Sequence, residues 1–226
     1  MGKKKRHHRI HREGRGIIVT LTFLIFAVNV PIYLYMSNWI FAITLLLSAV
    51  LLVFVTYFFR NPRRILDVSD PNLLIAPADG RVVVIEPTTE NEYFHDQRLQ
   101  VSIFMSPFNV HANWYPIEGK VLASEHQDGY HKGAWLPKSS TENERSLVVI
   151  ETPNKVQIAV RQIAGAMARR IVTYAKAGGH SHRNEHFGFI KFGSRVDMYL
   201  PLDTEIFVSV GEQVTGNETI IGRINS

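Results

Sequence analysis

A run of 43 residues, 17–59, contains no Asp, Glu, Lys, Arg or His, and it limits the possible folds of this chain more than any other segment does. As one helix it would be roughly 65 Å long, about twice the thickness of a bilayer hydrocarbon core of ~30 Å. Ser37 and Asn38 favour a turn near the middle of the run. We therefore predict two membrane-spanning helices, at about residues 17–35 and 39–59.

Basic residues flank this apolar run on both sides. Residues 1–16 carry a net charge of +6, three arginines lie at 60–64, and residues 65–226 sum to −4. The positive-inside rule places both flanks in the cytoplasm. We expect a basic cytoplasmic tail (1–16), a transmembrane helical hairpin (17–59) and a domain (60–226) on the cytoplasmic face of the cell (inner) membrane. A nucleic-acid partner is disfavoured, because no aromatic residues are interleaved with the basic run.

The rest of the chain is typical of a β protein. Turn residues separate short β-rich segments, which predicts a mainly β (α+β) fold with a barrel- or sandwich-like domain. Brief helices are predicted at 107–112 and 164–170. The chain contains no cysteine, which excludes a disulfide scaffold, a Cys-ligated metal and a thiolate nucleophile. The predicted strands are 81–86, 99–105, 120–123, 146–150, 156–163, 195–200, 205–208 and 219–224.

Several polar residues of the β-rich part are candidates for chemistry. Asp79 precedes a predicted strand, His111 follows one, and Ser194 follows Gly193 at the start of another. An Asp, a His and a Ser are the minimum set for activating a hydroxyl: the serine attacks, the histidine takes its proton and the aspartate orients the histidine. The Gly-x-Ser-x-Gly elbow of α/β-hydrolases is absent around this serine. Three further histidines, His180, His182 and His186, cluster after a Gly-Gly loop.

The segment around Ser194 resembles the processing-site signature of the short, archaeal-type, pyruvoyl-dependent phosphatidylserine decarboxylases. Lys191 departs from the arginine expected there, which conserves the charge. The similarity extends over the whole soluble part, and the membrane anchor also fits. Its blocks, in chain order, are residues 77–80, 106–111, 143–145, 164–172 and 184–201.

This resemblance implies a proenzyme that cuts itself between Gly193 and Ser194. The products would be a β-chain, 1–193, and an α-chain, 194–226, which remain together as a heterodimer. Ser194 would become a covalent pyruvoyl cofactor, with His111 as the base and Asp79 orienting it. No metal is implied. The resemblance leaves the oligomeric state of this heterodimer open.

The implied reaction is decarboxylation of phosphatidylserine, taken from the bilayer, to phosphatidylethanolamine. The substrate amine would form a Schiff base with the pyruvoyl group, which accepts the electron pair released with carbon dioxide. We expect His180, His182 and His186 to line the site or bind the lipid headgroup. Phospholipid biosynthesis by a membrane-bound lyase is thus the predicted role.

Two other classes of protein share single features with this sequence. A lysostaphin-type zinc peptidase would use His180, His182 and an aspartate as zinc ligands. Its upstream ligand pair would have to lie where this chain has the apolar run. A biotinyl- or lipoyl-like carrier would need a lysine at the tip of the C-terminal hairpin, and residues 214–217 contain none.

Overall fold

The computed structural model describes residues 9–129, 143–165, 170–191 and 194–225. The chain divides into two compact units, Met1–Arg63 and Arg64–Ser226.

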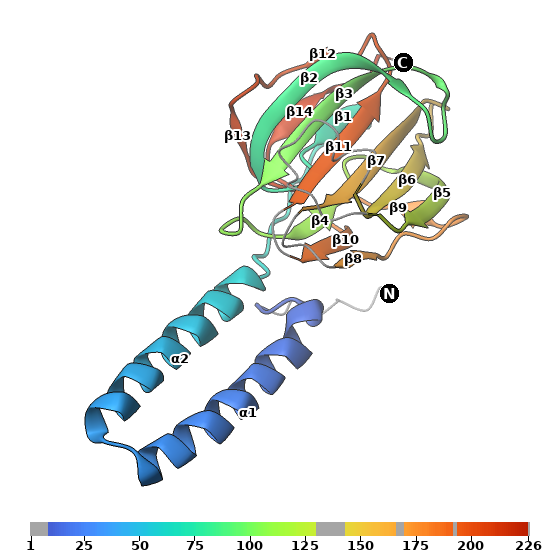
Figure 1. Cartoon of the computed structure of the whole chain (residues 1–226). Helices are drawn as coiled ribbons and strands as arrows, with labels where there is room; N and C mark the ends of the chain where they lie inside the picture. The colour runs from blue at the N-terminus through green and yellow to red at the C-terminus, as the bar shows by residue number, and fades with distance from the viewer. Residues whose placement is uncertain (1–8, 130–142, 166–169, 192–193, 226) are drawn as a thin grey trace, which may run out of the picture. The chain divides into compact units, whose positions relative to one another are not determined.

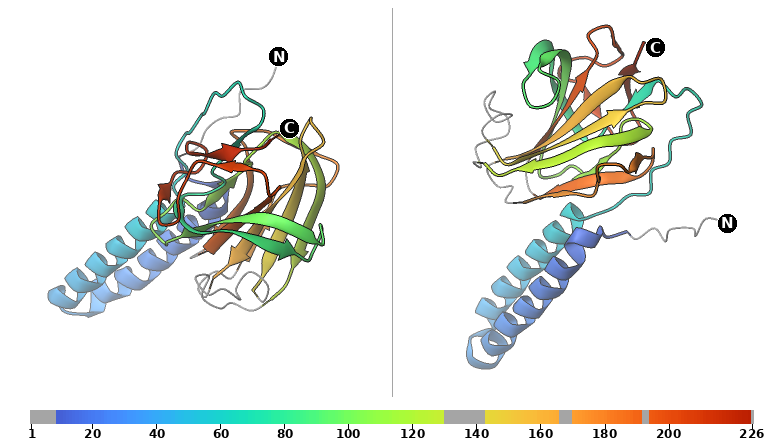
Figure 2. Two further views of the ribbon diagram at one scale, coloured as in Figure 1. Left: turned by 90° about the horizontal axis from the view of Figure 1, so that it is seen from above. Right: turned by 90° about the vertical axis from the view of Figure 1, so that its right-hand side faces the viewer.

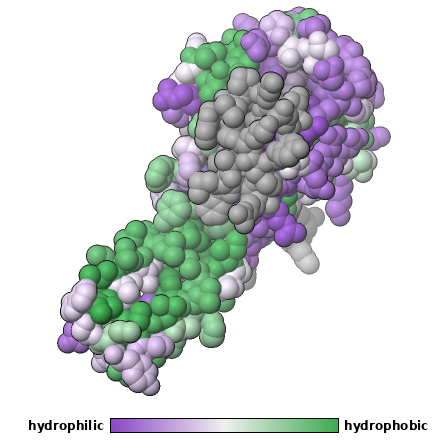
Figure 3. Space-filling view, in the orientation of Figure 1, coloured by the Kyte–Doolittle hydropathy of each residue, from purple (hydrophilic) through white to green (hydrophobic). Residues whose placement is uncertain are grey.

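The first unit is a pair of helices, α1 (Arg12–Tyr35) and α2 (Asn38–Phe58). Both are long and apolar enough to cross a membrane, and Figure 3 shows hydrophobic residues over most of their visible surface. The Asn29 side chain donates a hydrogen bond of 2.9 Å to Ser48 on the other helix. Since a polar group in hydrocarbon needs a partner, this bond favours the hairpin.

Helix α1 begins five residues earlier than the apolar run predicts. The backbone N–H of Glu13 donates to the imidazole Nδ1 of His11 at 3.4 Å, so the histidine caps the helix. A polar first turn can therefore extend the helix beyond the apolar segment.

The second unit is built almost entirely from antiparallel strands. An eight-stranded sheet, in the order β13-β2-β3-β11-β7-β6-β5-β9, curls into a half-barrel (Figure 1). Two three-stranded sheets, β1-β14-β12 and β4-β10-β8, accompany it, and the curl is seen from two further directions in Figure 2. The strands are β1 (Leu73–Ile75), β2 (Gly80–Glu90), β3 (Asp96–Met105), β4 (Ala112–Trp114), β5 (Gly119–Gln127), β6 (Arg145–Glu151), β7 (Gln157–Ala164), β8 (Arg170–Thr173), β9 (His180–Ser181), β10 (His186–Lys191), β11 (Ser194–Leu200), β12 (Glu205–Ile206), β13 (Gln213–Val214) and β14 (Ile220–Arg223).

This architecture confirms the predicted mainly β fold with an N-terminal helical hairpin. The inner face of the curled sheet carries the apolar core, to which β11 contributes Val196, Met198 and Leu200. Side chains alternate across a strand, so the intervening residues of β11 point to the other face.

The helix predicted at 107–112 is wrong. The Asn109 side chain accepts hydrogen bonds of 2.8 Å from both the backbone N–H and the hydroxyl of Ser106, which closes a turn, and Ala112 already belongs to β4. An Asn side chain that takes up backbone donors competes with helix formation. The helix predicted at 164–170 falls partly on residues 166–169, outside the described residues; Ala164 ends β7 and Arg170 begins β8.

Candidate active site

Ser194 is the first residue of β11, a strand at the centre of the large sheet. It pairs with Met105 at the end of β3 and with Ala164 at the end of β7. Its side chain is completely buried, and its Oγ lies 3.3 Å from the Met105 sulfur. Gly193 lies outside the described residues. A buried hydroxyl thus stands at the first described position after the expected cleavage bond.

A chain of buried amides continues inward from Met105. The Asn113 amide on β4 donates to the Met105 sulfur at 3.7 Å, and Gln162 on β7 donates to Asn113 at 2.7 Å. The Gln162 oxygen accepts from the hydroxyls of Ser146, at 2.8 Å, and Thr173, at 3.1 Å. Each amide has more than one hydrogen-bond partner, so the buried side chains next to Met105 form a polar and rigid network.

Asp79 lies just before β2, at the same end of the sheet as Ser194. Phe104 pairs with both Arg81 on β2 and Arg195 on β11. Gly80 can sit here only because it has no side chain: a Cβ would lie 2.1 Å from the backbone oxygen of Phe104. This close approach brings Asp79 against the end of β3.

The Asp79 carboxylate is buried and has several donors. Arg64 binds it with two guanidinium nitrogens, one of them 3.0 Å from Oδ2. The backbone N–H groups of Gly216, at 2.9 Å, and Val110, at 3.2 Å, also donate to it. The last bond links Asp79 to the residue next to His111.

His111 follows the turn that begins after Met105. Its ring is buried, and its Nδ1 lies 2.9 Å from the carbonyl oxygen of Asn109. Its own carbonyl accepts from the Ile190 N–H on β10 at 3.2 Å. Since β10 ends at Lys191, His111 is joined to the strand that leads into the expected cleavage bond. The structure therefore gathers Asp79, His111 and Ser194 at one end of the sheet.

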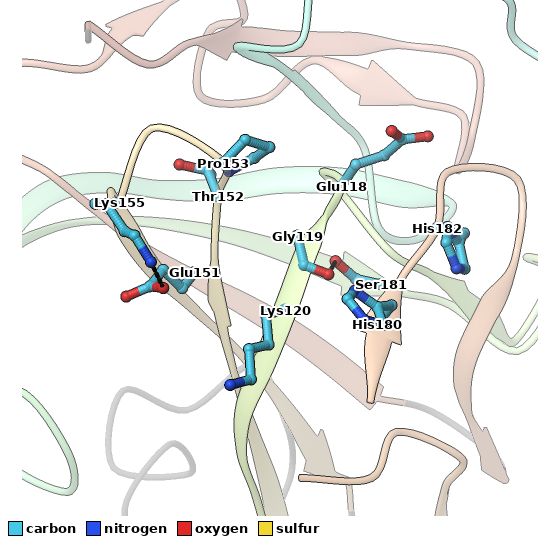
Figure 4. A pocket seen from close by; sticks show the side chains of 10 residues that line it. All are labelled: Glu118, Gly119, Lys120, Glu151, Thr152, Pro153, Lys155, His180, Ser181 and His182. Atoms are coloured by element: carbon cyan, nitrogen blue, oxygen red, sulfur yellow. Dashed lines mark hydrogen bonds and ion pairs between the residues drawn. The ribbon is translucent and has the colours of Figure 1, made fainter. Parts of the chain in front are cut away.

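The histidines after the Gly-Gly loop lie elsewhere. His180 and His182 line an open pocket of about 340 Å³ together with Lys120, Lys155 and Glu151 (Figure 4). Glu151 ends β6, whereas Arg145 begins it near Ala164 and Ser194. Six steps along the strand separate these ends, about 20 Å. The structure thus places His180 and His182 at the opposite end of the sheet from Ser194.

His186 has a different position again. It is the first residue of β10, and its ring packs edge-on against Trp114, with 4.9 Å between the ring centres. The binding of a lipid headgroup by these three histidines stays a prediction.

The outer face of the sheet carries buried charges behind Ser194. The Arg195 guanidinium donates to Asp197 at 2.6 Å and to Ser102 at 2.8 Å. Arg161 pairs with Glu90 at 2.7 Å. Burial alone would raise the pKa of Glu90, but three backbone N–H donors and Arg161 outweigh it and lower that pKa. The Arg195–Ser102 bond ties β11 to β3 on the face opposite the serine, and the Arg161–Glu90 pair joins β7 to the end of β2.

The sequence-based selection missed Arg64, Asn113 and Gln162. Gln162 had a signal, since it is a polar residue near the end of a predicted apolar strand, 156–163. No sequence signal distinguishes Arg64 as a site residue. It follows another arginine at the end of the apolar segment, where arginines indicate the orientation of a chain in the membrane.

Comparison with known proteins shows the family to which the chain belongs. Residues 51–222 match the family described as phosphatidylserine decarboxylase. The phosphatidylserine decarboxylase proenzyme of Bacteroides fragilis is 53% identical over 223 residues, covering 98% of each chain. The proenzymes of Parabacteroides distasonis and Porphyromonas gingivalis are 52% and 45% identical over 96% of this chain and 99% of theirs. The chain therefore belongs to the phosphatidylserine decarboxylase family and is an enzyme, a carboxy-lyase.

Proposed function

We propose that this enzyme converts phosphatidylserine to phosphatidylethanolamine with a pyruvoyl group made from its own Ser194. The observation that carries the proposal is a buried serine that begins a central strand, at the position where the family resemblance puts self-cleavage. Relatives that share about half of their residues with this chain are named proenzymes, which supports a processing step. This family membership also favours the decarboxylase over the zinc peptidase and the carrier.

The surroundings of Ser194 fit a pyruvoyl group. The group is no larger than the serine residue from which it is made. Met105 and Ala164 flank the position, and the Asn113 amide lies on the far side of the Met105 sulfur. A buried site of this kind excludes bulk water from a reactive carbonyl.

Self-cleavage would begin at the Ser194 hydroxyl. His111 takes the hydroxyl proton as Oγ bonds to the Gly193 carbonyl carbon. The peptide C–N bond then breaks and its nitrogen gains a proton, which leaves an ester and a free amino group. Loss of the Ser194 Cα proton then expels the Gly193 carboxylate and leaves dehydroalanine at residue 194. The dehydroalanine rearranges to its imine. Water adds to the imine carbon and ammonia leaves, which gives the pyruvoyl ketone.

His111 has a geometry that suits this role. A carbonyl oxygen only accepts hydrogen bonds, so the contact with Asn109 places the proton of the neutral ring on Nδ1. The Nε2 atom then carries the lone pair and is the basic atom. In the decarboxylation that follows, the same nitrogen can hold and return a proton near residue 194.

The pyruvoyl group supplies an electrophilic ketone that takes up the substrate amine and accepts the electron pair released with carbon dioxide. The chain's own residues hold this group in place. Strands β3 and β7 pair with β11 on both sides, and Arg195 of β11 donates to Ser102 of β3 on the opposite face of the sheet.

The two chains would stay together after the cut. The α-chain contains β11, which lies between two strands of the β-chain, as well as β13 and β14, which pair with β2 and β1. Backbone hydrogen bonds to both sheets therefore persist when one peptide bond is lost. This arrangement supports a stable heterodimer of β- and α-chains.

We place the catalytic unit on the cytoplasmic face of the inner membrane. Both flanks of the helical hairpin are basic, and the hairpin itself is long and apolar enough to cross twice. A tether to the bilayer raises the effective concentration of a lipid substrate at the site.

Intact mass of the purified enzyme tests the proposal. We expect two chains, with the smaller fragment, 194–226, carrying a pyruvoyl terminus that resists Edman sequencing. Ser194→Ala should give one uncut, inactive chain. Ser181→Ala is the matched control, because it removes another buried hydroxyl, at the opposite end of the sheet, and should cut normally. Active enzyme with an unbroken chain, or a fragment with a free amino terminus, would refute the pyruvoyl mechanism.

A further inference from the structure

Arg64 reaches from the connection after the membrane hairpin into the candidate active site. It lies six positions after Phe58, the last residue of α2, and begins the second unit. Its side chain is only 10% exposed. Besides the two bonds to Asp79, its guanidinium donates to the Gly216 carbonyl at 2.9 Å and lies 5.1 Å from the centre of the Trp114 ring. An arginine used only to set topology would have no need of these partners.

The backbone around Arg64 is also held by side chains. The Asn217 amide donates to the Arg64 carbonyl at 3.1 Å, and the Asn184 oxygen accepts from the Leu66 N–H at 2.9 Å. The two asparagines bond to each other at 2.7 Å. The backbone segment that carries the guanidinium is therefore itself held in place by hydrogen bonds.

Asp79 connects this segment to the turn that carries His111. Its Oδ1 accepts from Gly216 and its Oδ2 from Val110, so one carboxylate joins the backbone at two distant positions. Moving the carboxylate would move the Val110 amide and, with it, the neighbouring His111. A planar guanidinium bound through two nitrogens restricts both the position and the rotation of a carboxylate.

We infer that Arg64 is a positioning residue for His111, acting through Asp79. This inference rests on the proposed function, since it assumes that His111 is the base of self-cleavage. The segment that leaves the membrane anchor would then complete the active site instead of serving only as a tether. Displacement of a reacting group by about 1 Å can cost on the order of 100-fold in rate.

Self-cleavage of the freshly synthesised full-length chain in lipid nanodiscs provides the test. Arg64→Gln should slow the cut by roughly 10- to 100-fold. Arg64→Lys should restore only part of the rate, because lysine keeps the charge but not the two-nitrogen geometry. Arg64→Ala should regain rate when guanidinium chloride is added at millimolar, non-denaturing concentration.

Two comparisons separate positioning from simple stabilisation. If Arg64 acts through Asp79, the double variant Arg64→Gln/Asp79→Asn should cut no more slowly than Asp79→Asn alone. Arg183→Ala is the matched control, because Arg183 is another partly buried arginine that bonds to the carbonyls of the same connecting segment, at Asp70 and Leu73, and has no bond to Asp79 among the described contacts. It should gain nothing from added guanidinium. Unfolding midpoints are measured in a Ser194→Ala background, where no cleavage interferes.

The inference is overturned if Arg64→Gln cuts at the wild-type rate while Asp79→Asn does not, or if the two slowdowns multiply in the double variant. It is equally overturned if the rate losses of the Arg64 and Arg183 variants follow their losses of stability alone. A wild-type chain that never cuts would instead refute the proposed function itself, so the two failures are distinguishable.

Discussion

At the scale of single residues, the site depends on how one turn presents His111. The Asn109 side chain ties the turn to Ser106, while the Asn109 carbonyl faces the imidazole Nδ1. One residue thus closes the turn and sets which ring nitrogen carries the proton. The resemblance assigned the orienting role to Asp79, whose described bonds reach the backbone at Val110. Direct orientation of the ring by Asp79 stays a prediction.

We expect His111→Gln to slow self-cleavage by about 10²- to 10⁴-fold, because glutamine cannot take the hydroxyl proton. The measurement is the time course of chain cutting on a denaturing gel. His95→Asn is the control, since His95 is exposed in the hairpin between β2 and β3, at the other end of these strands, and has the positive φ that asparagine tolerates. Maturation of the His111 variant at the normal rate would remove His111 from the role of base.

At the scale of elements, the long hairpin β2–β3 covers the outer face of the sheet with its tip. Glu90 accepts three backbone N–H groups of the tip, from Glu92, Tyr93 and Phe94, and also pairs with Arg161 on β7. A single carboxylate therefore closes the tip and joins it to β7, a strand separated from the hairpin by β11. Burial, followed by the nearby Asp197, raises the pKa of Tyr199 beside this cluster, so its hydroxyl stays neutral and accepts a hydrogen bond from Arg161.

The lowered pKa of Glu90 predicts a loss of stability in acid. A carboxylate with a lowered folded-state pKa stabilises the fold above its unfolded value, near 4.5, and this contribution is lost as the pH falls through the folded value. Glu90→Gln should lower the free energy of unfolding by about 1–3 kcal/mol at pH 7, since it removes one of the two carboxylates that pair with Arg161 and leaves Glu92, at 3.0 Å, as the other. The free energy of unfolding of this variant should also change less as the pH falls.

The measurement is the free energy of unfolding in urea, taken at pH values from 7 down to below 4.5, with Ser194→Ala as the background so that no cleavage interferes. Glu86→Gln, an exposed position on the same strand, should leave the curve unchanged. If the free energy of unfolding falls equally with pH in the proteins with Glu90 and with Glu90→Gln, Glu90 does not contribute to the loss of stability in acid.

At the scale of the whole molecule, a helical hairpin that is long and apolar enough to cross a membrane shares one chain with a β-rich enzymatic unit. The basic residues that flank the hairpin predict that its short loop faces outward and that the catalytic unit faces the cytoplasm. The absence of cysteine from the sequence makes this orientation easy to probe, because any introduced cysteine is the only thiol.

A membrane-impermeant thiol reagent applied to intact cells should label Ser37→Cys, in the exposed loop between the helices. It should label Leu202→Cys, an exposed position of the catalytic unit, only after the membrane is permeabilised. The reverse pattern would mean that the catalytic unit faces outward. Labelling of both positions in intact cells would contradict a cytoplasmic catalytic unit as well.

Properties that depend on local patterns can be predicted from the amino-acid sequence alone. An uncharged run of 43 residues predicted two helices, and turn-bounded apolar segments predicted the antiparallel strands. Motif resemblance identified Ser194, His111 and Asp79 as candidates, because residue types and spacing carry that information. The wrong helix at 107–112 shows the limit: one asparagine side chain redirected a segment whose composition permitted a helix.

Contacts between side chains that are distant in sequence become evident only in the folded chain. Arg64 reaches the Gly216 carbonyl across 152 positions of sequence, and no local pattern distinguishes it from the adjacent arginine. His180 and His182, which resemble site residues in sequence, lie at the far end of the sheet because β9 pairs with the beginning of β5. Whether a residue is buried can be predicted from the polarity of its own segment. Which side chains contact one another depends on strand order and register, and these arise only when the whole sheet assembles.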